Sequence, residues 1–154
     1  MGSLVLLALH GLPGPAQQGG EAQAAACGVE PGAPGTVAVA WISQHEARAL
    51  VAAEGVAFVD CRPREDFEAG HVSGSVHLPE HADHPLEALL QRLGAVSTVI
   101  TYCNDACEHS SEIAARLLAA GLPDVRVLEG GMPAWLDNGF PAQSGACIDC
   151  GRHN

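Results

Sequence analysis

The hydrophobic positions between Trp41 and Pro141 follow two kinds of spacing that alternate along the chain. Four short runs are almost continuously apolar or β-branched, as in strands that are buried on both faces. These runs are Val56–Asp60, Val76–Leu78, Thr98–Tyr102 and Val125–Leu128. Between them the apolar residues recur at helical spacing, and each such segment ends close to a glycine.

The helical spacing predicts five helices. They run from Ser43 to Gly55, from Glu65 to Ala69, from His84 to Gly94, from Ser110 or Ser111 to Gly121, and from Met132 to Asn138. The first begins with a capping-box pattern, in which Ser43 and Glu46 exchange hydrogen bonds with free backbone amides. Strands that alternate with helices indicate right-handed crossovers and a parallel sheet, so the expected fold class is α/β.

The charge of the chain narrows the classes of function. Its seven basic residues are all arginine and stand against 18 acidic residues, which gives a net charge of −11 over 154 residues. Nucleic acids and anionic membranes both require a basic surface, so neither is expected as a partner. No apolar run reaches the length of a transmembrane helix. The length fits a single domain.

Composition divides the chain into three parts. Residues 1–36 are rich in glycine and proline and are expected to be flexible, residues 37–141 form the folded domain, and residues 142–154 form a cysteine-containing tail. Leu4–Leu9 is too short for the apolar part of a secretory signal, although Ala24–Cys27 is similar to a lipoprotein cleavage site. A cytoplasmic location is therefore favoured, with periplasmic or lipid-anchored export as the alternative.

Cys103 stands where a predicted strand ends and a serine-capped helix is about to begin. The N terminus of a helix offers unpaired N–H groups and a partial positive charge, which favour a thiolate over a thiol. Successive N–H groups in a tight loop can also cradle an added sulfur or an oxyanion. Cys103 is therefore the predicted nucleophile.

Three motifs occur in order along the folded domain. They are Phe58–Pro63 followed by Gly70–Ser75, then Val99–Cys103, and finally Leu128–Trp135. Together they resemble the signature of the rhodanese-like (sulfurtransferase) family. The resemblance implies a single-domain, three-layer rhodanese-like fold with a small parallel sheet and helices on both faces. It further implies that Cys103 carries sulfane sulfur as a persulfide, and that Asp60 and Arg62 support the surrounding loops.

The loop that begins at Cys103 departs from the usual pattern of that family. Its predicted members are Cys103, Asn104, Asp105, Ala106, Cys107, Glu108, His109 and Ser110. From Cys103 to His109 it has seven residues, the length of the related cell-cycle phosphatases and arsenate reductases rather than the shorter rhodanese loop. An arginine closes the loop in those enzymes, whereas here His109 stands in that place and Asp105 and Glu108 add negative charge. Free dianions are therefore disfavoured, and a neutral or protein-bound sulfur donor is expected.

The remaining cysteines and histidines keep a second class of function open. Cys107 is a candidate redox partner, because it can attack a persulfide or sulfenate on Cys103 and release it as a disulfide. The candidate metal ligands are His77, His81, His84, Cys147 and Cys150, although their spacing is not that of a standard site. The first alternative is thus a non-catalytic redox-sensing or metal-binding module. A further alternative, which the charge of the loop disfavours, is an arsenate reductase or phosphatase of the seven-residue-loop type. The sulfurtransferase interpretation requires no cofactor or metal, and its partners are a sulfane-sulfur donor and a thiol acceptor.

Overall fold

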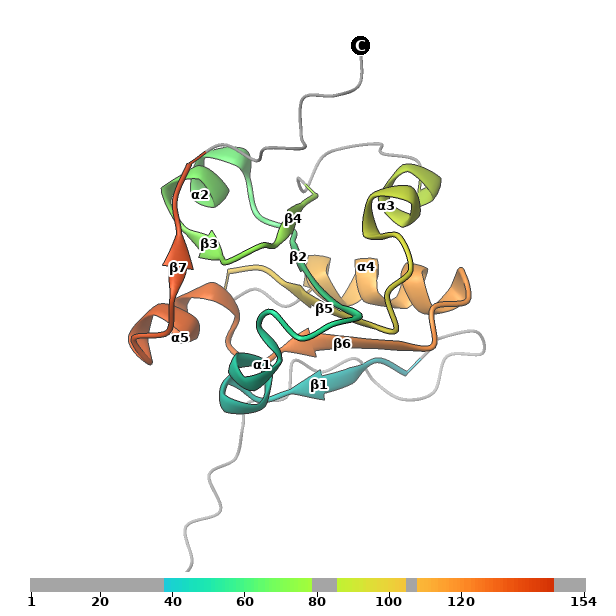
Figure 1. Ribbon diagram of the computed structural model, residues 1–154, viewed down its shortest axis with the longest axis horizontal. Coiled ribbons are helices and arrows are strands. Elements are labelled where there is room, and N and C mark those ends of the chain that lie inside the picture. The colour runs from blue at the N-terminus through green and yellow to red at the C-terminus, as the bar shows by residue number, and fades with distance from the viewer. Residues whose placement is uncertain (1–37, 79–85, 105–107, 146–154) are drawn as a thin grey trace, which may run out of the picture.

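The computed structural model describes residues 38–78, 86–104 and 108–145, and the statements below concern these residues (Figure 1). The strands are β1 (Ala40–Ile42), β2 (Val56–Asp60), β3 (His71–Val72), β4 (Val76–His77), β5 (Thr98–Tyr102), β6 (Asp124–Leu128) and β7 (Ala142–Gln143). The helices are α1 (Gln44–Leu50), α2 (Arg64–Ala69), α3 (Leu86–Leu93), α4 (Glu108–Ala119) and α5 (Gly131–Asp137). Five strands form a parallel sheet in the order β1-β6-β5-β2-β4, while β3 and β7 pair antiparallel beside it.

Helices cover both faces of the parallel sheet, so the molecule has three layers (Figure 1). One face packs against α3 and α4 through an aliphatic cluster that includes Val59, Leu89 and Leu117. The other face packs against α1 and α5 through a cluster that contains the aromatic rings of Tyr102 and Trp135. Because successive residues of a strand point to opposite faces, the central strands contribute side chains to both clusters.

The α/β fold class and the four predicted strands are confirmed, with small differences at the strand ends. The capping box is confirmed as well, since Ser43 Oγ accepts from the Glu46 N–H and the Glu46 carboxylate accepts from the Ser43 N–H. The helix that it starts ends at Leu50, earlier than the expected stop at Gly55. The helix ends there because Val51 adopts extended backbone angles, with φ −61° and ψ 127°.

Three short strands were not predicted. β1 has three residues and pairs with β6 at the edge of the sheet, whereas β3 and β7 have two residues each. Strands of this length are too short to show an alternation of apolar and polar positions. β7 lies just beyond Pro141 and pairs with β3. The predicted flexible segment, residues 1–36, lies outside the described residues.

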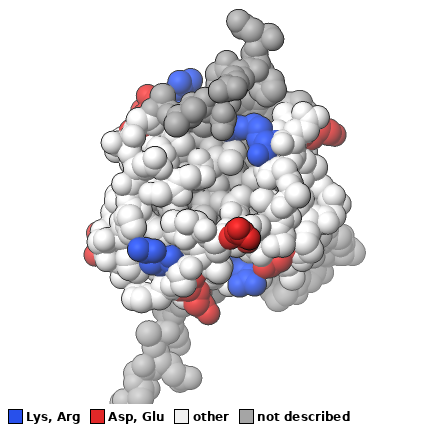
Figure 2. Space-filling model, viewed as in Figure 1, with Lys and Arg blue, Asp and Glu red and all other residues white. Residues whose placement is uncertain are grey.

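No helix in the described part of the chain is both long and apolar enough to cross a membrane. On the face drawn in Figure 2, arginines are separated from one another and lie among acidic side chains.

Candidate active site

β2 and β5 end side by side at the carboxyl edge of the parallel sheet. Their register pairs Asp60 with Tyr102, and the Cys61 N–H donates to the Tyr102 carbonyl at 2.9 Å. This bond continues the ladder one residue beyond the end of β2, so Cys61 follows β2 at the same edge of the sheet where Cys103 follows β5. Parallel α/β sheets bind ligands and carry out reactions at this edge. The sheet therefore brings together the first two motifs of the sequence, around Asp60 and around Cys103.

Cys103 is buried directly after β5, with 7% of its surface exposed. Its carbonyl accepts a hydrogen bond from the Met132 N–H at 2.9 Å, so the start of α5 holds the backbone of the candidate nucleophile. The third motif of the sequence thus contacts the second. A contact between residues so far apart in the chain was not predicted.

Gly131 explains why this contact requires a glycine. Its φ is +55°, a conformation that side chains rarely adopt, and a Cβ placed on it would lie 2.3 Å from the Cys103 carbonyl oxygen and 2.7 Å from that of Asn104. No larger residue fits without moving the loop. Gly131 of the third motif therefore permits a close approach of α5 to the candidate nucleophile.

Two side-chain hydrogen bonds hold the chain at the start of the candidate loop. Before it, Thr101 Oγ1 donates to the Ser110 carbonyl at 2.9 Å, which joins the end of β5 to the start of α4. Next to Cys103, Asn104 Nδ2 donates to Asp66 Oδ2 of α2 at 3.0 Å. The loop is therefore tied to two different helices.

The predicted start of α4 at Ser110 or Ser111 is wrong, because the helix already begins at Glu108. Serine is common at the N-cap, but here both serines are buried inside the first turns of the helix. Ser111 Oγ and His109 Nε2 are buried and have no hydrogen-bond partner among the described residues. Buried polar atoms are usually paired, so these two atoms are notable at the start of α4.

Asp60 and Arg62 form a buried ion pair at the end of β2. Arg62 Nη2 lies 2.7 Å from Asp60 Oδ2, and Arg62 Nε donates to both carboxylate oxygens, at 3.0 and 3.2 Å. Burial alone would lower the pKa of Arg62, but the hydrogen bonds and charge of Asp60 outweigh it, and that pKa is raised. Arg62 Nη2 also donates to the Gly70 carbonyl at 2.6 Å, which ties the end of β2 to the turn before β3.

Tyr102 links the central strand to the turn that carries β3. Its hydroxyl accepts from the Val72 N–H at 3.1 Å and donates to Ser75 Oγ at 3.0 Å. Burial, reinforced by the nearby charge of Asp60, raises the pKa of Tyr102 well above its usual range, so the hydroxyl stays protonated. The Arg62 guanidinium carbon lies 5.8 Å from the centre of the ring, within the range of a cation–π contact.

His77, one of the candidate metal ligands, is a buried partner of the core. The Phe67 ring stacks on both His71 and His77, with centroid separations of 3.8 and 4.6 Å. His71 Nδ1 hydrogen-bonds to the Phe67 carbonyl at 2.7 Å, and His77 Nε2 to the Arg62 carbonyl at 2.9 Å. Among the residues that the structure describes, no group of three or more His, Cys, Asp or Glu is placed to hold a metal ion.

Several predicted site residues lie outside the described residues. They are Asp105, Ala106 and Cys107 of the loop and the candidate ligands His81, His84, Cys147 and Cys150. The backbone of Glu108 begins α4, and its side chain is not described. The assignment of these loop residues to the active site, the redox role of Cys107 and the metal hypothesis therefore stay predictions.

The fold and the site define a class of protein. It is an α/β domain with a cysteine at the carboxyl end of a central parallel strand. The model of the rhodanese-like domain family matches residues 43–138, which include all three sequence motifs. The chain belongs to this family.

Curated relatives of two kinds match the chain. Thiosulfate sulfurtransferase GlpE of Pseudomonas fluorescens (strain Pf0-1) is 34% identical over 105 residues, which cover 67% of this chain and 89% of that protein. HTH-type transcriptional regulator Rv0324 of Mycobacterium tuberculosis is 32% identical over 98 residues, 62% of this chain but 41% of the regulator. The human TBC domain-containing protein kinase-like protein is 34% identical, and 9% of its length is matched. In the latter two proteins the matched region is a part of a longer chain.

Solved structures show the same fold. Thiosulfate sulfurtransferase from Pseudomonas aeruginosa superposes with a TM-score of 0.63 and 20% identity, covering 71% of this chain and 20% of that chain. The BH2092 protein from Bacillus halodurans superposes with a TM-score of 0.60 and 23% identity, covering 68% of this chain and 77% of that chain. At these identities the likeness is one of fold.

Proposed function

We propose that this protein is a sulfurtransferase that carries sulfane sulfur as a persulfide on Cys103. The observation that carries the proposal is the position of Cys103 at the carboxyl end of β5, directly before the loop that leads to α4. Family membership supports it, because the GlpE relatives bear the name thiosulfate sulfurtransferase. The proposed partners are a sulfane-sulfur donor and a thiol acceptor.

The proposed reaction has two halves. In the first, the Cys103 thiolate attacks the outer sulfur of a donor R–S–SH, the new S–S bond forms as the old one breaks, and RS⁻ departs. In the second, an acceptor thiolate attacks the outer sulfur of Cys103–S–SH, and the Cys103 thiolate is the leaving group. Each half conserves protons and electrons, and turnover is ping-pong.

The described contacts support this chemistry through the backbone of the nucleophile. The bond from Met132 to the Cys103 carbonyl and the bond from Asn104 to Asp66 hold the main chain while the sulfur changes partners. The bond from Thr101 to Ser110 keeps the first turn of α4 close to the end of β5. The N–H groups of that turn carry partial positive charge, which stabilises both the attacking and the leaving thiolate.

The charge of the loop supports a donor of low charge over free thiosulfate. Asp105 and Glu108 bring two carboxylates to the loop, and no arginine stands between Cys103 and Arg116. A dianion entering this loop meets repulsion that an alkyl persulfide or a protein-bound persulfide avoids. We expect faster sulfur uptake from an alkyl persulfide than from thiosulfate, with the difference narrowing as salt is added.

Intact-mass spectrometry after treatment with a sulfane donor tests the proposal. We expect the mass of one added sulfur in the wild type and in Cys107→Ser, and no addition in Cys103→Ser. The added mass must disappear with a thiol reductant, because a sulfinic acid has nearly the same mass and resists reduction. The proposal fails if the wild type takes up no sulfur, or if Cys103→Ser takes up as much.

A further inference from the structure

Gln44 is a buried polar side chain that the proposed sulfur transfer has not yet involved. It is the first residue of α1, directly after the N-cap Ser43, and 9% of its surface is exposed. Glutamine is mostly found at protein surfaces, and a buried one needs hydrogen bonds that compensate for the loss of water. The partners of Gln44 therefore indicate why a glutamine is buried at this position.

The side-chain amide of Gln44 gives both of its hydrogens to one turn. Gln44 Nε2 donates to the Glu129 carbonyl at 2.5 Å and to the Gly131 carbonyl at 3.0 Å, and both residues lie between β6 and α5. These bonds set the orientation of the amide, because a rotated amide would place its oxygen against two carbonyl oxygens. Gln44 Oε1 is left buried, with no hydrogen-bond partner in the described part of the chain. An unpaired buried acceptor lowers stability, so the two bonds to the turn are made at a cost.

The peptide group between Gly131 and Met132 links Gln44 to Cys103. Its carbonyl oxygen accepts from Gln44, and its N–H donates to the Cys103 carbonyl at 2.9 Å. One peptide group is therefore hydrogen-bonded at both ends. Hydrogen bonds that are chained in this way polarise one another, so the bond from Gln44 strengthens the bond to Cys103.

The turn that Gln44 holds has a backbone that needs support from outside. Gly130 and Gly131 follow one another with φ +68° and +55°. Glycine adopts this left-handed conformation without strain, but it adopts many others as readily. The Glu129 N–H donates to the Ile42 carbonyl at 3.1 Å, so the end of β1 and the Gln44 side chain hold the turn together. These external bonds select one conformation of the turn.

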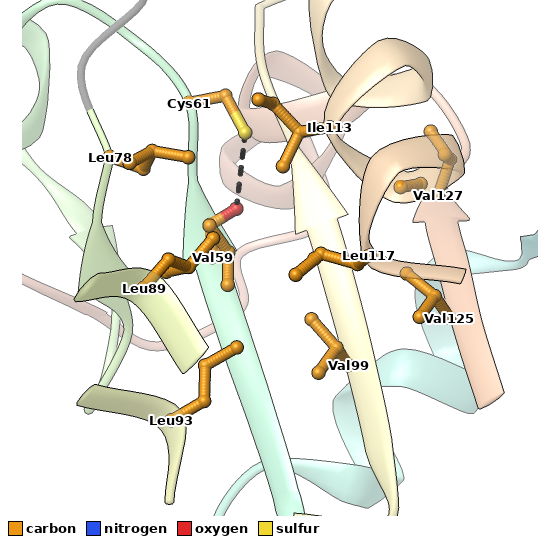
Figure 3. Packing of buried hydrophobic residues seen from close by; sticks show 11 residues of the cluster. Val59, Cys61, Leu78, Leu89, Leu93, Val99, Ile113, Leu117, Val125 and Val127 are labelled. Atoms are coloured by element: carbon orange, nitrogen blue, oxygen red, sulfur yellow. Dashed lines mark hydrogen bonds between the residues drawn. The ribbon is translucent and has the colours of Figure 1, made fainter. Parts of the chain in front are cut away.

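The strand that leads to Cys103 is held differently on its two faces. On the face toward α4, Val99 of β5 packs among aliphatic side chains such as Leu117, and such contacts have no preferred direction (Figure 3). At the start of α5, the chain of hydrogen bonds from Gln44 ends on the Cys103 carbonyl. Because hydrogen bonds are directional, this chain fixes the orientation of the Cys103 carbonyl as well as its position.

We propose that Gln44 is a positioning residue for Cys103, which acts through the Gly131–Met132 peptide group and touches no reacting atom. With this peptide group fixed, the Cys103 main chain keeps the sulfur near the N–H groups at the start of α4, which favour the thiolate. Without Gln44 the turn is free to rotate, and the sulfur samples positions that those N–H groups stabilise less. This inference rests on the proposed role of Cys103 as the nucleophile, but it does not require that Cys103 accept sulfur.

The rate at which iodoacetamide alkylates Cys103, measured over a range of pH, tests the proposal. Every protein carries Cys107→Ser, so that alkylation of the tryptic peptide 93–116 reports on Cys103 alone. The midpoint of the pH profile reports how strongly the surroundings favour the thiolate, whereas the plateau at high pH reports how accessible the sulfur is. A lower global stability changes neither quantity while the protein stays folded, and circular dichroism at each pH verifies the fold.

Two uncharged variants remove the bonds of Gln44 in steps. Gln44→Met keeps the length of the side chain but has no donor. We expect alkylation of Cys103 at pH 7 to be several-fold slower in this variant, with the pH profile displaced to higher pH and the plateau little changed. Gln44→Asn keeps the amide on a side chain that is one methylene shorter, so it cannot reach both carbonyls, and its profile should lie between the other two. Neither substitution adds a charge near Cys103.

Gln143→Met is the matched control. Gln143 Oε1 accepts from the Gly74 N–H at 3.1 Å, another bond between a glutamine side chain and a turn, but one that does not lead to Cys103. We expect this variant to keep the rate and the pH profile of the parent protein. An equal displacement in Gln143→Met and Gln44→Met would overturn the proposal, because it would show a general loosening of the fold.

The second outcome that would overturn the proposal is a folded Gln44→Met or Gln44→Asn variant with the rate and the pH profile of the parent protein. The bonds from Gln44 would then serve stability alone. Alkylation of Cys103 does not depend on whether the protein accepts sulfane sulfur. A failure of this proposal is therefore distinct from a failure of the proposed function, which intact-mass spectrometry detects.

Discussion

Two Asp-x-Arg ion pairs with the same spacing lie at opposite ends of the parallel sheet. Asp60 and Arg62 stand at the carboxyl end of β2, where their side chains are 0% and 6% exposed and 2.7 Å apart. Asp124 and Arg126 stand at the start of β6, where their side chains are 32% and 39% exposed and 2.9 Å apart. The same Asp-x-Arg pattern therefore forms an ion pair both in a buried and in a partly solvent-exposed environment.

The surroundings of the two ion pairs explain why their structural roles differ. Arg62 also bonds to the Gly70 carbonyl and faces the Tyr102 ring, so the buried pair joins β2, β5 and the turn before β3 around the candidate nucleophile. At the exposed pair, Thr98 Oγ1 donates a hydrogen bond to Asp124 Oδ2. At the exposed pair, water can take the place of a lost partner. At the buried pair, the loss of one partner leaves the charge of the other uncompensated.

Removing the carboxylate of the buried pair is the largest expected effect. Asp60→Asn keeps the shape of the side chain but leaves the Arg62 charge buried and unpaired, which should lower the free energy of unfolding by about 3–5 kcal/mol. Urea unfolding of this variant and of its matched control, Asp124→Asn, measures the contrast. Equal losses at the two sites would break the comparison.

The close packing at the carboxyl end predicts the next largest effect. Gly131→Ala puts a Cβ 2.3 Å from the Cys103 carbonyl oxygen. We expect the free energy of unfolding to fall by about 3 kcal/mol and sulfur uptake to be reduced. The control is Gly94→Ala in the turn before β5, where φ is a similar +65° and nothing lies within 4 Å of the added atom. A loss near 1 kcal/mol is expected there, from the backbone conformation alone. Similar losses in both variants would show that crowding at Cys103 is unimportant.

Two substitutions on β5 compare its two ends within one strand. Tyr102→Phe removes the hydroxyl that accepts from the Val72 N–H, and a buried donor left without a partner should cost about 1–3 kcal/mol. Thr98→Val, at the other end of the strand, removes a partly exposed bond to Asp124 and should change stability by less than about 0.5 kcal/mol. Thermal unfolding of both variants measures the two losses of stability. A larger loss of stability for Thr98→Val than for Tyr102→Phe would contradict the comparison.

The smallest expected effect is the acid dependence of the exposed pair. Hydrogen bonds from Arg126 and then from Thr98 lower the pKa of Asp124, so this carboxylate stabilises the folded state above about pH 4, its pKa when unfolded. That stabilisation is lost as the pH falls through the folded pKa, and solvent screening limits it to about 0.5 kcal/mol. Stability curves of the wild type and Asp124→Asn should therefore converge below pH 4. A gap that widens toward low pH would reverse the predicted sign.

The strands that carry the site could be predicted because their signals are local. Val56–Asp60 and Thr98–Tyr102 are apolar along their whole length, since both of their faces are covered by helices. The start of α4 was misplaced because serine at Ser110 is equally compatible with a cap and with a buried position. The structure places Ser110 and Ser111 inside the helix and buries both, an outcome of tertiary packing that sequence spacing does not reveal.

The sequence by itself determined the α/β class, the central strands and the place of Cys103 at a strand end, because hydrophobic period and chain order are local properties. Only the tertiary structure decided which Asp-x-Arg pair is buried and why Gly131 must lack a side chain. Each of these depends on which strands become neighbours. Strand order arises from packing of the whole sheet, and for that reason identical local patterns at Asp60 and Asp124 acquire different energies.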